Sequence, residues 1–217
     1  MVNWTEIDTV LLDMDGTLLD LHFDNHFWLE HLPARFAQLK DMPVAEACTL
    51  LETLSDTLHG HLNWYCLDHW SETLSVDILG LKREVSHLIR FRADSEAFLQ
   101  FLRKQNKQIV LVTNAHPTAL ELKLESSGLA QHLDARYSTH TFGLAKENPG
   151  FWGRLQEAGQ FDYQRCLFID DSLSVLRCAR AEGLPHTLQV LQPDSAQPVR
   201  EPSEFPGFTR FAELMPR

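Results

Sequence analysis

Residues 8–18 read DTVLLDMDGTL, an apolar run that ends in two aspartates, a glycine and a threonine. A short apolar run followed by a turn signal is typical of a strand that is buried on both faces of a parallel sheet. Gly16 permits a tight turn after the strand, because glycine adopts backbone conformations that other residues avoid. The pattern therefore predicts a first strand whose carboxyl end presents Asp13 and Asp15.

From Asp94 onward, strand and helix patterns alternate along the chain. Apolar runs predict strands at 108–113, 135–138, 165–169 and 186–191, and amphipathic spacing predicts helices at 95–105, 117–127, 149–158 and 173–181. This alternation predicts an α/β fold with a doubly wound parallel sheet of the Rossmann-like type. The proline-rich stretch 193–206 is expected to form an irregular surface tail before a short terminal helix.

The segment between the first strand and Asp94 has a different pattern. From about residue 23 to residue 90, apolar residues recur at a spacing of three to four, and no convincing strand occurs. We therefore expect an inserted all-helical domain. The predicted division is an α/β core of residues 1–20 and 92–217, with the helical domain at residues 21–91.

Composition restricts the class of function. The formal net charge of -11 disfavours binding to a nucleic acid polymer or to an anionic membrane surface. No run of about 20 apolar residues occurs, and the N-terminus has no leader pattern, so a cytoplasmic protein is expected. Cys48, Cys66, Cys166 and Cys178 lack the spacing of a zinc site, and we expect them to be reduced thiols of the core.

Polar residues follow three of the predicted strands. Asp13 and Asp15 come after the first, Thr113 and Asn114 after the second, and Asp170 and Asp171 after the strand at 165–169, while Lys146 lies in a connecting loop. In an open parallel sheet, the ligand crevice lies at the carboxyl ends of the strands. These residues are therefore expected to converge, although they are far apart in the sequence.

A group of carboxylates in one crevice predicts a cation. Oxygen ligands with room for water and phosphate suit Mg²⁺. We expect Asp13, Asp171 and the main-chain carbonyl of Asp15 to hold the ion. Asp170 is a further candidate ligand, and either Asp170 or Asp171 could instead orient Lys146 or a metal-bound water.

The order of these motifs resembles the haloacid dehalogenase-like hydrolase superfamily across nearly the whole chain. The matching motifs are Asp13-Met14-Asp15-Gly16-Thr17-Leu18, Thr113-Asn114, Lys146 and Phe168-Ile169-Asp170-Asp171-Ser172. The resemblance implies that the helical insertion is a mobile cap. One departure is that many relatives have K-P-x-P at the lysine motif, whereas this chain has K-E-N-P from Lys146.

The resemblance also implies catalytic roles that the chemistry supports. Asp13 is the expected nucleophile toward phosphorus, and Asp15 the expected general acid and base. Thr113, Asn114 and Lys146 are expected to bind the phosphate oxygens. Because Asp15 serves to protonate an alkoxide, a magnesium-dependent phosphomonoesterase is favoured over a dehalogenase.

Substrate specificity is expected to come from the helical insertion, which is rich in aromatic residues. Trp28 and Trp64 are candidates for stacking on a base, and His26 and Asn63 for reading its edge. Residues 18–28, 62–71 and 138–146 resemble the bacterial GMP/IMP nucleotidases of the superfamily. That resemblance implies a purine nucleoside monophosphate as the small-molecule substrate. A sugar-phosphate or phosphoglycolate-type phosphatase, and a catalytically silent phosphometabolite-binding protein, remain alternatives.

Overall fold

A parallel sheet of six strands forms the centre of the computed structural model, which describes residues 2–216. The strand order is β3-β2-β1-β4-β5-β6, and every neighbouring pair is parallel. The strands are β1 (Thr9–Leu12), β2 (Gln108–Thr113), β3 (Ala135–Ser138), β4 (Cys166–Asp170), β5 (His186–Val190) and β6 (Gly207–Phe208). Strand order reverses at β1, so the crevice of a doubly wound sheet lies at the carboxyl end of β1.

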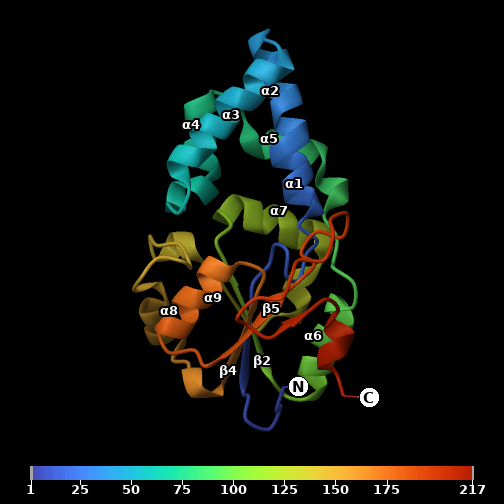
Figure 1. The fold of residues 1–217 in the computed structure, drawn as a ribbon, viewed down its shortest axis with the longest axis vertical. Coiled ribbons are helices and arrows are strands. Elements are labelled where there is room, and N and C mark those ends of the chain that lie inside the picture. Colours follow the sequence, from blue (N-terminus) through green and yellow to red (C-terminus); the bar gives the residue numbers. More distant parts are fainter. Residues whose placement is uncertain (1, 217) are drawn as a thin grey trace.

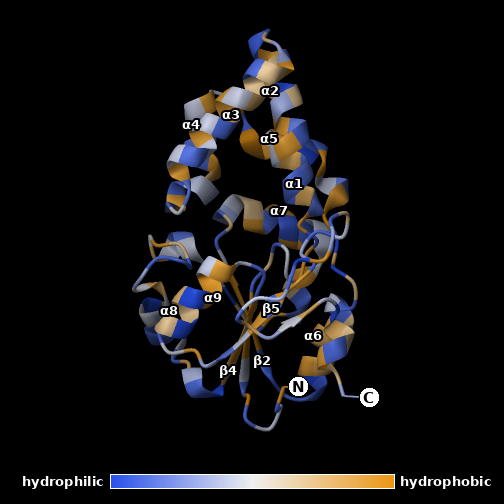
Figure 2. Cartoon of the chain, in the orientation of Figure 1, coloured by the Kyte–Doolittle hydropathy of each residue, from blue (hydrophilic) through white to orange (hydrophobic). Residues whose placement is uncertain are grey.

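The central strands are apolar throughout because helices cover both faces of the sheet. Val10 and Leu12 pack in a cluster with Phe98 of α6 (Ser95–Lys104), whereas Leu11 packs in a cluster with Trp152 of α8 (Phe151–Gly159). Figure 2 shows the strands as an apolar centre between helices with mixed surfaces. Burial on both faces removes the alternation of polar and apolar residues that a half-exposed strand would show.

Two further helices complete the layers of the core. They are α7 (Pro117–Ser127) and α9 (Leu173–Ala181). Figure 1 shows α8 and α9 on one side of the sheet and α6 on the other. The predicted doubly wound parallel sheet is confirmed, and the predicted helices and strands differ from the observed ones by no more than about two residues at any end.

The C-terminal stretch contains a strand that the sequence pattern did not indicate. After an irregular segment, β6 pairs with β5 through Gln189 opposite Gly207 and Val190 opposite Phe208. A side chain at residue 207 would come within 2.8 Å of Leu191 Cγ, so a glycine is needed for this close approach. A two-residue strand carries too little periodicity to be recognised in a sequence. The terminal helix is one 3₁₀ turn, η7 (Phe211–Leu214).

Between β1 and α6, the named secondary-structure elements of the described segment are all helices or helical turns. They stand above the carboxyl edge of the sheet (Figure 1). None of the helices within residues 2–216 has the length and apolar character needed to cross a membrane. The elements of this helical segment are α1 (His22–His26), a π-helical turn η1 (Phe27–His31), α2 (Leu32–Lys40), α3 (Val44–Leu58), η2 (Leu62–Tyr65), α4 (Leu67–Leu74), α5 (Ile78–Glu84) and η3 (Ser86–Leu88).

The chain enters and leaves the helical segment at one place. The main-chain N–H of Asp20 donates to the carbonyl of Arg90 at 2.9 Å, and the N–H of Arg92 donates to the carbonyl of Leu18 at 2.9 Å. The buried guanidinium of Arg92 also donates to the carbonyl of Thr17 at 3.1 Å. Two adjacent, hydrogen-bonded connections therefore join the helical segment to the sheet.

Candidate active site

The turn after β1 places two carboxylates at the carboxyl edge of the sheet. The Met14 carbonyl accepts hydrogen bonds from the main-chain N–H groups of Leu18 at 3.0 Å and Leu19 at 2.8 Å. Gly16 has a φ of 83°, and a Cβ at this position would lie 3.0 Å from Asp171 Cγ. Glycine is required here by both the backbone conformation and the lack of space. The tight turn exposes Asp13 and Asp15 to a common cavity.

Lys146 connects the end of β1 with the end of β4. Its Nζ donates to Asp13 Oδ1 at 2.5 Å, to Asp170 Oδ2 at 2.7 Å and to the carbonyl of Val112 at 3.2 Å. Burial works to lower the pKa of Lys146, but the two carboxylates outweigh it and raise the pKa above its ordinary value. Lys146 is therefore a permanent buried cation beside Asp13.

Three carboxylates gather around this lysine. Oxygen atoms of Asp13, Asp170 and Asp171 lie within 4.8 Å of one another. Burial raises the pKa of each of the three to about 6, although Lys146 acts in the opposite direction. We call these three aspartates and Lys146 the Lys146 group. Its excess of buried carboxylates and its all-oxygen donor set fit a hard cation such as Mg²⁺.

The two aspartates at the carboxyl end of β4, Asp170 and Asp171, have different partners. Asp170 accepts from Lys146 through Oδ2 and from the main-chain N–H of Ser172 through Oδ1 at 2.8 Å. Asp171 accepts through Oδ2 from Arg200 at 3.2 Å. Both oxygens of Asp170 are engaged with the protein, which suits it to orient Lys146, whereas Asp171 retains a carboxylate oxygen for a cation.

The end of β2 supplies the other expected phosphate ligands. Asn114 Oδ1 accepts from the main-chain N–H of Lys146 at 2.9 Å, and Thr113 Oγ1 accepts from the N–H of Ala115 at 3.0 Å. Both side chains are buried and line the cavity. The structure thus brings Thr113, Asn114 and Lys146 to the same cavity as Asp13.

A second ionic group lies beside Asp15 and was not apparent from the sequence. Lys123 of α7 contacts Asp15 Oδ1 at 2.7 Å and Asp24 Oδ2 at 2.6 Å, and Lys82 of α5 contacts Asp24 Oδ1 at 2.9 Å. Burial opposes ionisation of Asp24, but the two lysines outweigh it and lower its pKa to about 2. We call these four residues the Lys123 group.

Within the Lys123 group, the pKa of Asp15 is shifted in the opposite direction to that of Asp24. Burial raises the pKa of Asp15 to about 6, with Lys123 acting against this rise. Lone lysines in helices normally indicate solvated charges, so no signal in the sequence marked Lys82 or Lys123. Their roles follow only from the three-dimensional contacts.

The cavity between the sheet and the helical segment has a volume of about 720 Å³. This volume is in the range of sites that bind small molecules. Its floor contains Asp13 and Lys146, and its helical wall contains Trp28, Trp64 and Tyr65. The cavity is therefore bounded by charged groups on one side and by aromatic rings on the other.

The four residues expected to recognise a base divide into two pairs. Trp28 and Trp64 line the cavity, and Trp64 is held by a hydrogen bond from Nε1 to Ser55 Oγ at 2.9 Å. The structure does not bring His26 and Asn63 there. His26 is half-buried, with its Nδ1 3.1 Å from Oε2 of the exposed Glu30, and the Asn63 side chain is exposed. The helical spacing of apolar residues predicted helices in this segment, but it did not identify which of their residues face the cavity.

The unusual residues after Lys146 connect the core with the helical segment. Glu147 accepts from Tyr65 Oη at 2.8 Å and from Asn114 Nδ2 at 2.9 Å. Asn148 Nδ2 donates to the carbonyl of Gly60 at 3.1 Å. Residues that depart from the K-P-x-P pattern thus contact the wall of the cavity.

Comparisons with known proteins agree with this geometry. Residues 7–183 match the family model of haloacid dehalogenase-like hydrolases. The chain is 41% identical over 215 residues to the GMP/IMP nucleotidase YrfG of Escherichia coli, covering 99% of this chain and 97% of that protein.

Solved structures share the fold at low sequence identity. A HAD phosphatase from Thermococcus onnurineus matches with a TM-score of 0.78 and 18% identity, covering 96% of each chain. A HAD family enzyme from Bacteroides thetaiotaomicron, crystallised in complex with magnesium and inorganic phosphate, matches with a TM-score of 0.60 and 15% identity over 86% of this chain and 95% of that chain.

Proposed function

Since this chain belongs to the haloacid dehalogenase-like hydrolase family and is a phosphoric monoester hydrolase, we propose that it hydrolyses purine nucleoside 5'-monophosphates, with GMP and IMP preferred. The observation that carries the proposal is the shared cavity, in which Asp13, Asp15 and Lys146 face Trp28 and Trp64. The 41% identity to a GMP/IMP nucleotidase supports the choice of substrate.

Asp13 is the proposed nucleophile. Its carboxylate oxygen forms a bond to phosphorus while the bond from phosphorus to the 5' oxygen breaks, which gives an aspartyl-phosphate and an alkoxide. Asp15 gives its proton to that alkoxide, so the nucleoside leaves as an alcohol. Asp15 then takes a proton from the water that attacks phosphorus, which releases inorganic phosphate and restores Asp13. A pKa of about 6 suits Asp15 to both proton transfers near neutral pH.

The phosphate would be held by groups already placed around Asp13. Lys146 supplies a fixed positive charge, and Thr113 and Asn114 supply a hydroxyl and an amide at the end of β2. Such preorganised donors stabilise the negative charge that redistributes over the phosphoryl oxygens in the transition state.

Asp13 and Asp171, together with the main-chain carbonyl of Asp15, are the proposed ligands of Mg²⁺. Asp170 is assigned to hold Lys146, since both of its carboxylate oxygens accept hydrogen bonds from the protein. When bound, Mg²⁺ supplies charge neutralisation that allows an anionic carboxylate and an anionic phosphate to approach each other.

Residues 21–91 are proposed to act as the specificity cap. Trp28 and Trp64 are the proposed stacking partners of the base. Glu52, which lines the cavity from the same helix as Ser55, is the proposed reader of the base edge. A 6-oxopurine presents an N–H donor at N1, whereas adenine presents a lone pair there that a carboxylate repels.

A substrate screen tests this proposal directly. With Mg²⁺ present, kcat/KM for GMP and IMP should exceed that for AMP, pyrimidine monophosphates and sugar phosphates by about tenfold or more, which corresponds to about 1.4 kcal/mol or more of difference in transition-state stabilisation. Activity should vanish in excess chelator and return with Mg²⁺, whereas Ca²⁺ should inhibit because its larger coordination shell misplaces the phosphate.

Three results would contradict parts of the proposal. Preference for glycolate or hexose phosphates would remove the nucleotidase assignment. Full activity in chelator would remove the metal. An unchanged GMP to AMP ratio in Glu52→Gln, with Asp56→Asn as a control from the same wall of the cavity, would remove Glu52 as the edge reader.

A further inference from the structure

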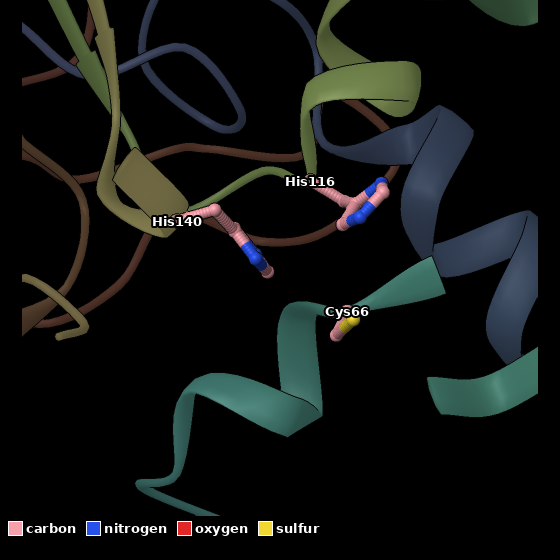
Figure 3. A group of neighbouring side chains, drawn as sticks. All are labelled: Cys66, His116 and His140. Atoms are coloured by element: carbon pink, nitrogen blue, oxygen red, sulfur yellow. The ribbon is translucent and has the colours of Figure 1, made fainter. Parts of the chain in front are cut away.

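Three potential soft-metal ligands converge outside the proposed catalytic residues. Cys66, His116 and His140 each have a ligand atom within 4.8 Å of those of the other two. Figure 3 shows their side chains directed toward one common space. Cys66 precedes α4 in the helical segment, His116 precedes α7, and His140 lies in the 3₁₀ turn η5 (Thr139–Thr141). We propose that they form a second metal site, for a soft divalent ion such as Zn²⁺, that joins the helical segment to the core.

Of the three residues, His140 has the ring nitrogen that is most clearly available to a metal. Its Nε2 is buried and has no hydrogen-bond partner among the residues that the structure describes. Burial and the nearby ring of His116 lower the pKa of His140 to about 4. The imidazole is therefore neutral at physiological pH and offers a lone pair, which is the form that binds a metal. A metal would satisfy an atom that is otherwise costly to bury.

His116 is oriented for the same purpose. Its Nδ1 lies 2.8 Å from Thr118 Oγ1, which fixes the ring and turns Nε2 away from Thr118. The rings of His116 and His140 are nearly perpendicular, with centroids 4.9 Å apart. A hydrogen bond to the second ring nitrogen is the usual support of a metal-binding histidine.

Asp68 is placed to supply a fourth ligand. Its Oδ2 lies 3.5 Å from His116 Nε2, and its side chain is 74% exposed and so is free to adjust. Two ligands of one tetrahedral zinc ion lie about 3.3–3.6 Å apart, given Zn–N and Zn–S bonds of about 2.0 and 2.3 Å. Closing the present cluster around an ion requires side-chain shifts of about 1 Å. Water would complete the shell if Asp68 does not.

The donor types distinguish this site from the Lys146 group. One thiolate and two imidazoles suit Zn²⁺ and related transition metals, whereas the carboxylates of the Lys146 group suit Mg²⁺. On binding, the Cys66 thiol loses its proton to solvent as the sulfur–metal bond forms, so binding weakens in acid.

Of the four free cysteines, Cys166 alone is buried, and Cys66 is half-buried, so the expectation that all four belong to the core was wrong.

A metal at this site would affect turnover, because the site lies beside the cavity. His116 also lines the cavity, and Cys66 follows Tyr65, which contacts Glu147 across the cavity. An ion bound here would hold the helical segment against the core and slow exchange of substrate and product. This consequence, unlike binding itself, rests on the proposed function.

Binding can be measured without any enzyme assay. The reduced protein, in excess Mg²⁺ to occupy the carboxylates, is titrated with Co²⁺ and then with Zn²⁺. We expect one Co²⁺ per chain with a thiolate-to-cobalt absorption band, displacement of Co²⁺ by one Zn²⁺, and a rise in thermal unfolding temperature with Zn²⁺. Absence of the thiolate band, or a stoichiometry below one, would overturn the proposal.

Variants locate the ion. Cys66→Ser and His140→Gln should each weaken Zn²⁺ binding by about 100-fold or more, because each removes a direct ligand. Cys178→Ser and His132→Gln, both half-buried in the core, serve as matched controls and should bind as the parent does. Equal binding in all four variants would place the ion elsewhere and overturn the site. If one ligand variant does not fold, the other still decides the question, and failure of the nucleotide screen would leave these readouts unaffected.

Discussion

The two buried ionic groups of the cavity differ in their balance of charge. The Lys146 group has three carboxylates around one lysine, and burial raises the pKa of all three to about 6. The Lys123 group has two carboxylates and two lysines, and Asp24 within it has a pKa lowered to about 2. The first group has unneutralised negative charge that favours a cation, whereas the second is neutral as built.

The two groups also differ in where their residues come from. All members of the Lys146 group lie on the core, at the ends of strands and in one loop. The Lys123 group spans both parts, since Asp24 and Lys82 lie in the helical segment and Asp15 and Lys123 lie in the core. Lys82 Nζ also lies 4.3 Å from the ring centre of Phe27, a cation–π contact. The second group therefore couples the position of the helices to Asp15.

The largest expected effect concerns the Lys146 group. Asp13→Asn should lower kcat by about 1,000-fold or more, because an amide cannot act as the nucleophile. The fold should persist, since the substitution removes one of the crowded charges. Steady-state kinetics with GMP measures the first claim and circular dichroism the second. Substantial residual turnover would show that Asp13 is not the nucleophile.

The Lys123 group should respond mainly in stability. Lys123→Met should lower the free energy of unfolding by about 3–5 kcal/mol, because it leaves Asp15 without a buried cation and Asp24 with only one. Urea unfolding at neutral pH measures this loss. Lys104→Met, at an exposed position of α6, is the matched control and should change stability by less than about 0.5 kcal/mol. A similar small loss for Lys123→Met would show that the pairing contributes little.

The contrast between the groups also explains what could be predicted from the sequence. Asp13, Asp15, Lys146 and Asp171 follow apolar strands or lie in a loop within a recognisable motif order, so both the sheet and their convergence were predictable. Strand ends in a parallel sheet meet at one edge, which makes sequence position a guide to spatial position.

Helical positions carry no comparable guide. Lys123 lies among leucines of α7 and became a site residue only because α7 packs beneath the helical segment. Conversely, His26 and Asn63 have suitable chemistry but do not line the cavity, since His26 is half-buried beside Glu30 and Asn63 is exposed. Which face of a short helix turns inward depends on tertiary packing, which local periodicity does not determine in an insertion that is apolar on several sides.

The smallest expected effect is a difference in pH dependence between the groups. The pKa of Asp24 in the folded protein is about 2, below the ordinary value of 3.8, so its pairing contributes stability above about pH 4 that is lost as the pH falls toward 2. The full contribution is about 2 kcal/mol, of which about 1 kcal/mol is lost between pH 5 and pH 3.

The Asp24→Asn variant has no carboxyl group that titrates at this position. The Asp170→Asn variant is the matched comparison, because the pKa of Asp170 is shifted in the opposite direction. The folded pKa of Asp170 is raised to about 6, so its ionisation costs stability as the pH rises from about 4 to about 6. Both comparisons are made in chelator. The free energy of unfolding of the parent protein minus that of Asp24→Asn should decrease as the pH falls from 5 to 3. The free energy of unfolding of the parent protein minus that of Asp170→Asn should increase as the pH falls from 6 to 4. Urea unfolding curves across this range measure both differences, and slopes of the same sign would show that the two groups are not electrostatically distinct.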